Sequence, residues 1–468
     1  MSEASPTLEK IVSLAKRRGF VFPTSDIYGG LANSYDYGPM GTELLKNIRD
    51  LWWKYFITTR PDMVGLQSQI LQHPQTWVAS GHVEAFHDPL IEDKVTHKRY
   101  RVDHIIETWL SQNTTVLNLE MIVVENMSLK EMAAFITKHK IKSPDGNKLS
   151  EPKQFNLLFE TQIGSVAGEK STVYMRGETA QGIFTNFKNV LDSTRVQLPF
   201  GIGNIGTSFR NEVTTGQFVF RTLEFELAEI EYFFDPEKED WKKIMTQWKN
   251  EMWQFATKTL GIQENNLKWR QHTDKERSHY SLDTWDLDYK YPFGYKELWG
   301  LAYRTDFDLK QHQKHSGQNL EYIDPQTQKK FLPHVIEPAV GVARLFLMIL
   351  CDAYWEDKKN NRTVLKLKPS LAPYKAAVFP LAKNKPELVE KARKIFDELS
   401  KKYHVAWDER SSIGKRYLYQ DEIGTPYCIT VDYETLEDGT VTIRDRDTTE
   451  QIRLPMTELA DYLRNRVK

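Results

Sequence analysis

Two short segments between Phe209 and Phe234 constrain the fold of this chain more than any other part of its sequence. They predict two antiparallel strands joined by a loop: Phe209-Arg210-Asn211-Glu212 and, after a gap, Arg221-Thr222-Leu223-Glu224-Phe225. Alternate side chains of a strand share a face, so Arg210 and Glu212 should project together from the first strand. The second strand should present on one face Arg221, Leu223, Phe225, Leu227, Glu229 and Glu231.

This predicted surface carries the groups that a nucleoside triphosphate and an amine-bearing substrate require. Guanidinium groups bind phosphates through paired hydrogen bonds, and carboxylates hold an ammonium group. An aromatic ring can stack on a base. A hairpin whose outer face is covered by salt bridges is the alternative interpretation, and the hairpin alone leaves both open.

Length and charge set the limits for the rest of the chain. A chain of 468 residues predicts two to three domains at about 150 residues each. The formal net charge is −1, so a nucleic-acid partner would have to be bound by local basic patches. The longest apolar run, residues 345–351, is far too short to cross a bilayer, and no membrane partner is expected.

The cysteines and the N-terminus point to a cytoplasmic protein. Cys351 and Cys428 stand alone without CxxC spacing, which argues against structural zinc and against a disulfide framework. Residues 93–97 carry no cysteine either, so no zinc is expected there. The first ten residues have no apolar segment of a signal peptide.

Two domains are expected, at about 1–365 and 366–468. In the first, helices are predicted near residues 7–18, 39–58 and 241–260, with a helical insertion at about 105–153. Strands should dominate residues 155–234 and 279–309. In the second, four predicted strands alternate with three helices, which favours a small, mostly parallel α/β sheet.

Several strings resemble a known family. The hairpin resembles motif 2 of class II aminoacyl-tRNA synthetases, and residues 335–344 resemble their motif 3. Three further strings, at 28–39, 176–182 and 421–426, resemble glycyl-tRNA synthetases of the homodimeric type. The resemblance covers nearly the whole chain except the insertion. It implies an α+β catalytic domain built on an antiparallel sheet, an α/β anticodon-binding domain, and a dimer interface on the helix at 40–58.

The same resemblance implies an ATP site. Arg210 would hold the α-phosphate, Arg221 the distal phosphates and Arg344 the γ-phosphate, with Arg210 and Arg344 as the catalytic pair. Phe225 would stack on adenine, and Glu297 would lie beside Mg²⁺. The complete expected ATP-binding set is Arg210, Asn211, Glu212, Phe220, Arg221, Phe225, Glu297, Leu298, Gly341 and Arg344.

The other implied partners are glycine and tRNA(Gly). Glycine would be converted with ATP to glycyl-adenylate and then transferred to the 3′ end of the tRNA, without an editing domain. The expected glycine-binding set is Arg101, Glu178, Glu229, Glu337 and Ala339. The expected tRNA-binding set is Lys415, Arg416, Arg444 and Arg446, the last two because they should share a strand face.

Six positions depart from the family pattern: Gly177, Gly216, Leu223, Leu227, Ala339 and Ala343. These departures leave three hypotheses open: a glycine–tRNA ligase, a synthetase with altered amino-acid specificity, and a non-catalytic accessory protein that binds nucleic acid. Burying an arginine is costly unless it is paired, so the retained charged residues favour ligand binding.

Overall fold

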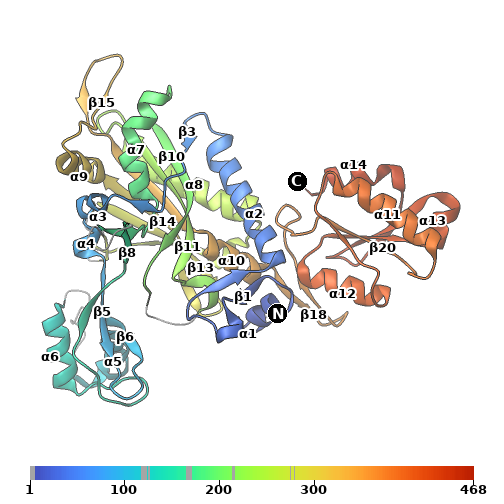
Figure 1. Cartoon of the computed structure of the whole chain (residues 1–468), viewed down its shortest axis with the longest axis horizontal. Coiled ribbons are helices and arrows are strands. Elements are labelled where there is room, and N and C mark those ends of the chain that lie inside the picture. The colour runs from blue at the N-terminus through green and yellow to red at the C-terminus, as the bar shows by residue number, and fades with distance from the viewer. Residues whose placement is uncertain are drawn as a thin grey trace.

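The computed structural model describes residues 6–117, 124, 127–164, 171–212, 217–274, 276–278 and 280–467. Figure 1 shows a large N-terminal part, a separate C-terminal part built around β20, and a small unit with α5 and α6 that projects from the large part. Helix α1 (Leu8–Arg17) and the β18–β19 region lie where the two main parts meet.

A seven-stranded sheet forms the centre of the large part. Its strand order is β12-β13-β14-β17-β11-β10-β3. All neighbours pair antiparallel except β10 and β3, which pair in parallel. The bounds are β3 Met63–Gly65, β10 Phe200–Phe209, β11 Glu224–Phe234, β12 Leu267–Gln271, β13 Asp283–Tyr291, β14 Gly294–Thr305 and β17 His334–Gly341.

Strand β11 shows how the two faces of this sheet differ. Its even-numbered residues 228–234 belong to a large apolar core, which also contains residues of α2 (Pro39–Trp53), α8 (Trp241–Gln254) and α10 (Val342–Ala353). The odd-numbered residues face the other way, where Phe233 packs with α7 (Ala180–Ser193). Because side chains alternate along a strand, Phe225, Leu227 and Glu229 emerge on that second face.

Helix α7 corrects the prediction that strands dominate residues 155–234. It fills the middle of that stretch and buries Ile183, Phe184 and Phe187 against the sheet. The surrounding strands are β8 Phe159–Ile163 and β9 Ser171–Met175, which form a small sheet with β4 Leu71–Gln72. Three shorter helices lie nearby: α3 Pro74–Ala79, α4 His82–Ala85 and α9 Phe307–Ser316. Three two-stranded pairs complete the large part: β1 Val21–Pro23 with β2 Tyr35–Tyr37, β15 Tyr322–Ile323 with β16 Lys330–Phe331, and β18 Tyr354–Asp357 with β19 Arg362–Leu365.

The insertion is larger than the predicted 105–153, and it is not only helical. A three-stranded sheet of β5 (His87–Glu92), β6 (Arg99–Arg101) and β7 (Lys153–Asn156) brackets two helices, α5 Val102–Leu117 and α6 Leu129–His139. It has its own apolar core, which includes Ile91, Ile106 and Phe135.

The C-terminal sheet is mixed, which corrects the expectation of a mostly parallel one. Its order is β21-β20-β22-β23-β24, with two parallel and two antiparallel pairings. The strand bounds are β20 Ala376–Pro380, β21 Val405–Trp407, β22 Tyr427–Val431, β23 Thr440–Asp445 and β24 Gln451–Pro455. The helices are α11 Pro386–Ser400, α12 Ile413–Ile423, α13 Tyr433–Asp438 and α14 Leu459–Arg464. The predicted four strands and three helices did not include β24 and α13.

Candidate active site

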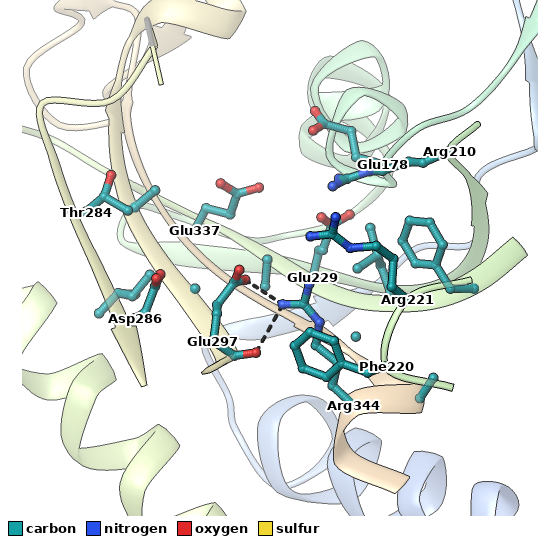
Figure 2. Close-up of a pocket in the computed structure, with 18 of the residues that line it drawn as sticks. Glu178, Arg210, Phe220, Arg221, Glu229, Thr284, Asp286, Glu297, Glu337 and Arg344 are labelled. Atoms are coloured by element: carbon teal, nitrogen blue, oxygen red, sulfur yellow. Dashed lines mark hydrogen bonds and ion pairs between the residues drawn. The ribbon is translucent and has the colours of Figure 1, made fainter. Parts of the chain in front are cut away.

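A pocket of about 250 Å³ opens on the second face of the central sheet, over β11, β14 and β17. Its three arginines, Arg210, Arg221 and Arg344, are partly exposed and lie at its mouth, whereas the carboxyl groups of Glu178, Glu229 and Glu337 are buried and form its floor. Figure 2 shows the two sets side by side. The predicted residues that line it are Glu178, Arg210, Glu212, Phe220, Arg221, Phe225, Glu229, Glu297, Glu337, Ala339, Gly341 and Arg344. The fold therefore brings together most of the expected ATP and glycine sets.

Arg210 and Arg221 enter the pocket from the two ends of the hairpin that were predicted as strand. Both lie just outside the strands, because β10 ends at Phe209 and β11 begins at Glu224. Arg210 donates from Nε to the Gly177 carbonyl at 3.1 Å, and its guanidinium lies over the Phe225 ring at 5.4 Å. The Arg221 Nη1 atom lies 3.6 Å from a Glu212 carboxylate oxygen. Among the residues that the structure describes, both guanidiniums keep donors free for a phosphate-bearing ligand.

Arg344 faces them from the first turn of α10. Its Nη1 atom lies 3.0 Å from Glu297 Oε1 and donates to the Glu297 carbonyl at 3.2 Å, as Figure 2 shows. The guanidinium also lies over the Phe220 ring at 4.6 Å. Burial raises the pKa of the Glu297 carboxyl, but Arg344 outweighs it, so the pKa lies below its usual value. Glu297 is therefore ionised, and the positive end of α10 adds to the attraction for anions.

Glu178 and Glu229 lie at the N-terminus of α7. The Thr179 backbone N–H donates to Glu229 Oε2 at 2.6 Å, and the Thr179 hydroxyl bonds the same oxygen. Glu178 accepts from Gln181 Nε2 at 2.9 Å and lies 3.3 Å from His82 Nε2. Burial raises the pKa of Glu178, but His82 and Arg304 outweigh it and lower the pKa overall. Burial and the Glu178 charge raise the pKa of Glu229.

Glu337 is the third floor carboxylate and is bound from below by Arg304. Arg304 is 1% exposed and donates from Nη1 to Glu337 Oε2 at 2.9 Å, while Nε and Nη2 each bond Asp308 at 2.8 Å. Burial, with Glu229 and Glu178 nearby, raises the pKa of Glu337 to about 8. Neighbouring carboxyl groups in this pocket therefore have pKa values on opposite sides of neutrality.

Glu231 follows on the same strand but does not line the pocket. It is fully buried, and within the described structure neither carboxyl oxygen has a hydrogen-bond partner. The register that pairs Glu229 with Ala339 and Tyr232 with Ile336 puts Glu231 opposite Glu337. Burial, followed by the Glu337 charge, raises its pKa well above the usual value, so Glu231 is a neutral acid below the floor.

Two carboxylates beside Gly300 offer hard oxygen ligands. A Cβ at Gly300 would lie 3.9 Å from Glu297 Oε1 and 4.0 Å from Asp286 Oδ1. The other Asp286 oxygen is held by His272 Nε2 at 2.8 Å and by Arg270. No cluster of three or more His, Cys, Asp or Glu in the described part of the chain is arranged to hold a metal. Two carboxylates plus phosphates are nonetheless the usual ligand set of Mg²⁺.

Three residues of the expected ligand sets do not line the pocket. The Leu298 side chain is fully buried in the core on the opposite face of the sheet, because it is out of phase with Glu297. The Asn211 backbone N–H bonds the Leu157 carbonyl at 2.9 Å. Arg101, in the insertion unit, is paired with Asp88 at 2.7 Å and with Asp103 at 2.6 Å.

Three of the four predicted tRNA contacts need a correction. Arg416, Arg444 and Arg446 are buried, and only Lys415 is exposed. Arg416 donates to the Pro380 carbonyl at 2.7 Å, Arg444 makes two bonds to Asp421, and Arg446 donates to the Gly424 carbonyl. Their guanidiniums are used inside the protein, so they are not free to reach nucleotide bases.

Among the departures from the family pattern, Leu227, Ala339 and Ala343 line the pocket. Gly177 supplies the carbonyl that binds Arg210, the Leu223 N–H bonds the Asn33 carbonyl, and Gly216 lies outside the described residues. The sequence assigned no role to Arg304, Gln181, His82 or Asp286. Gln181 lies in the 176–182 string that resembles the family, but its partners Asp308 and His312 are distant in sequence.

Comparison with known proteins finds relatives of both parts of the chain. Residues 375–466 match the family model described as "Anticodon binding domain". A glycine–tRNA ligase of Bacillus cereus is 48% identical over 471 residues, which cover 99% of each chain. One from Staphylococcus haemolyticus is 49% identical over 471 residues, covering 98% of this chain and 99% of the relative. Because the similarity spans both the pocket-bearing part and the C-terminal domain, the chain belongs to the glycine–tRNA ligase family.

Proposed function

We propose that this chain is a glycine–tRNA ligase, which activates glycine with ATP and transfers it to the 3′ end of tRNA(Gly). The observation that carries the proposal is the arrangement of one pocket. Arg210, Arg221 and Arg344 surround its mouth, and Glu178, Glu229 and Glu337 form its floor. A triphosphate and an α-ammonium group would thus be bound side by side.

In the first step, a glycine carboxylate oxygen attacks the α-phosphorus of ATP. A new O–P bond forms, the bond to pyrophosphate breaks, and glycyl-adenylate remains. Arg210 would stabilise the charge on the α-phosphate, while Arg221 and Arg344 bind the distal phosphates. Phe220 or Phe225 would stack on adenine once the guanidinium over its ring moves to a phosphate.

In the second step, the terminal ribose hydroxyl of tRNA attacks the glycyl carbonyl carbon. The ester C–O bond forms, the anhydride C–O bond breaks, and AMP leaves with the hydroxyl proton on its phosphate. No side-chain nucleophile is needed, since orientation and charge stabilisation lower the barrier.

Glu297 and Asp286 fit a magnesium ion, because their oxygens converge beside Gly300, where only a hydrogen projects. When bound with ATP, the ion would neutralise phosphate charge. Glu297 would first have to exchange part of its ion pair with Arg344 for the ion.

Glycine would be selected by its ammonium group and by size. Glu178, Glu229 and Glu337 hold the ammonium, and residues larger than glycine are rejected by contact with the pocket walls. Leu227 and Ala339 line the same pocket, which keeps alanine and serine as the competing substrates to test. Arg101, in the insertion, would contact substrate only after rearranging its pairs with Asp88 and Asp103.

We also propose a class II catalytic domain at residues 1–365, carrying the insertion, and an anticodon-binding domain at 366–468. The chain would act as a homodimer through the helix at 40–58, in the cytoplasm. Both cysteines are buried and unpaired, which suits a reducing compartment. No helix in the described residues is long and apolar enough to cross a membrane. Sedimentation at several protein concentrations tests the dimer.

The deciding experiment is amino-acid-dependent ATP–pyrophosphate exchange with magnesium, with glycine, alanine and serine compared. Exchange with glycine alone supports the proposal. Exchange with alanine or serine would indicate altered specificity at Leu227 and Ala339. Folded protein that binds tRNA but shows no exchange would favour an accessory nucleic-acid-binding protein.

A further inference from the structure

The short hairpin β18–β19 joins the pocket to the C-terminal part of the molecule. Helix α10 carries Arg344 at its first turn and ends at Ala353, and β18 begins at the next residue, Tyr354. Tyr354 pairs with Leu365 of β19, and the Lys366 N–H donates to the Ala353 carbonyl at 2.7 Å. The hairpin is therefore a direct, hydrogen-bonded continuation of the helix. Figure 1 shows it beside α12.

Arg362 of β19 links this hairpin to the C-terminal part. Its Nε donates to Asp357 at 2.8 Å, within the hairpin. Its Nη1 donates to Asp421 Oδ2 of α12 at 2.9 Å and to the Arg446 carbonyl at 2.7 Å. The side chain is 3% exposed. One buried guanidinium thus binds both parts of the molecule.

Asp421 is shared by two arginines. It is fully buried and accepts from Arg362 and, through both oxygens, from Arg444 at 2.8 and 3.0 Å. Apolar packing surrounds this contact: Ile423 of α12 lies in the same core as Leu365 and Leu367. The C-terminal part can rotate little without disrupting this buried charge pair, because a shifted partner would leave a buried charge without a hydrogen bond.

A second contact holds the same helix from another side. Glu422, next to Asp421, bonds Arg17 at 2.9 Å and also bonds Arg18, both at the end of α1. The Arg18 guanidinium also lies over the Tyr419 ring at 4.4 Å. Two consecutive residues of α12 are therefore bound by two segments of the large part that are distant in sequence. Two such contacts fix the orientation of the C-terminal domain relative to the large part, which a single contact would not.

We propose that Arg362 is a positioning residue for the tRNA-dependent step. It holds the C-terminal domain at the angle from the pocket at which the 3′ end of a bound tRNA reaches the adenylate. This inference rests on the proposed function and adds a residue to it. Adenylate formation needs only ATP and the amino acid, and Arg344 lies in their pocket nine residues of α10 before Ala353, or about 14 Å along the helix.

The test measures both reactions on the same variant. In Arg362→Ala, glycine-dependent exchange should stay within about twofold of wild type, while kcat/KM for tRNA should fall about tenfold or more because the reacting ends are misplaced. Arg362→Lys keeps a charge but not the forked geometry, and should restore only part of the loss. The matched control is Arg453→Ala, since Arg453 pairs with Asp432 within the C-terminal domain and should change neither reaction.

Two outcomes would overturn the inference: an equal fall in both reactions, or wild-type aminoacylation by Arg362→Ala. The variant should fold, because Asp421 keeps its two bonds to Arg444. If it does not, Glu422→Gln tests the same orientation and should again lower only the tRNA reaction. Wild-type protein without glycine-dependent exchange would instead refute the proposed function. Small-angle scattering should show a larger radius of gyration for Arg362→Ala, and an unchanged one would also count against the inference.

Discussion

The floor of the pocket predicts that glycine binding becomes tighter as pH rises from 6 to 8. Glu337 is a floor carboxyl whose pKa burial raises to about 8, so it is mostly protonated at neutral pH. The ammonium group of glycine binds the ionised form. Binding is therefore coupled to release of a proton, and the raised pKa of Glu229 acts in the same direction.

The magnitude follows from the single pKa of Glu337. The apparent dissociation constant scales as one plus ten raised to the difference between the pKa and the pH. With a pKa of about 8, this factor is about 100 at pH 6 and about 2 at pH 8, so the KM for glycine should fall about 50-fold between them. Above pH 8 it should level off.

The assay is ATP–pyrophosphate exchange at saturating ATP, with the KM for glycine measured at half-unit steps of pH. The KM for ATP serves as an internal control, since the arginines that would bind ATP stay charged over this range. Glu337→Gln should bind glycine weakly and lose most of the pH dependence. A KM for glycine that stays constant from pH 6 to 8, or rises, would refute the assignment of Glu337 to the ammonium site.

Three other substitutions test separate parts of the structure. Arg344→Ala should lower the rate of ATP–pyrophosphate exchange by about 10²–10³-fold, the usual effect of losing one donor that stabilises transition-state charge. The control Arg195→Ala, at an exposed arginine, should leave the rate unchanged. Equal rates for the two variants would show that Arg344 does not act in the site. Burial raises the pKa of Glu231, so wild type loses stability as pH rises above the unfolded-state pKa. Glu231→Gln should therefore be more stable than wild type at pH 8 by about 1 kcal/mol or more, and this gain should vanish near pH 4. Urea unfolding at both pH values measures the gain, and a gain that does not depend on pH would contradict the reasoning. Gly206→Ala would place a Cβ 2.1 Å from Arg176 Nη2 and should lower the free energy of unfolding in urea by about 1–3 kcal/mol. The control Gly414→Ala, with open space around it, should be nearly neutral. Equal stabilities of the two variants would show that Arg176 can move.

Local sequence was sufficient for much of the pocket. Alternation along β11 correctly predicted that Phe225, Leu227 and Glu229 share the pocket face, because the strand period is a property of the backbone itself. Helical spacing of apolar residues likewise predicted the helix that begins near Pro39, and those residues form its buried face. The boundaries were less accurate, since Arg210 and Arg221 proved to lie just beyond the strands.

Contacts between segments that are distant in sequence could not be predicted from local sequence patterns. Arg444 and Arg446 looked like surface charges that could bind RNA, and both are buried, with Arg444 paired to Asp421. Arg304 had no role assigned from the sequence, and the fold places it between Asp308 and Glu337.

The sequence by itself determined which residues alternate on each strand, where helices begin, and which charges the chain carries. Only the tertiary structure decided which of those charged groups are exposed to water and which pair with one another. The reason is electrostatic: the environment of a carboxyl or guanidinium depends on its burial and on partners within a few ångströms. Those partners, such as Glu178, Glu229 and Glu337, come from the segment before α7, from β11 and from β17, which only the folded structure brings together.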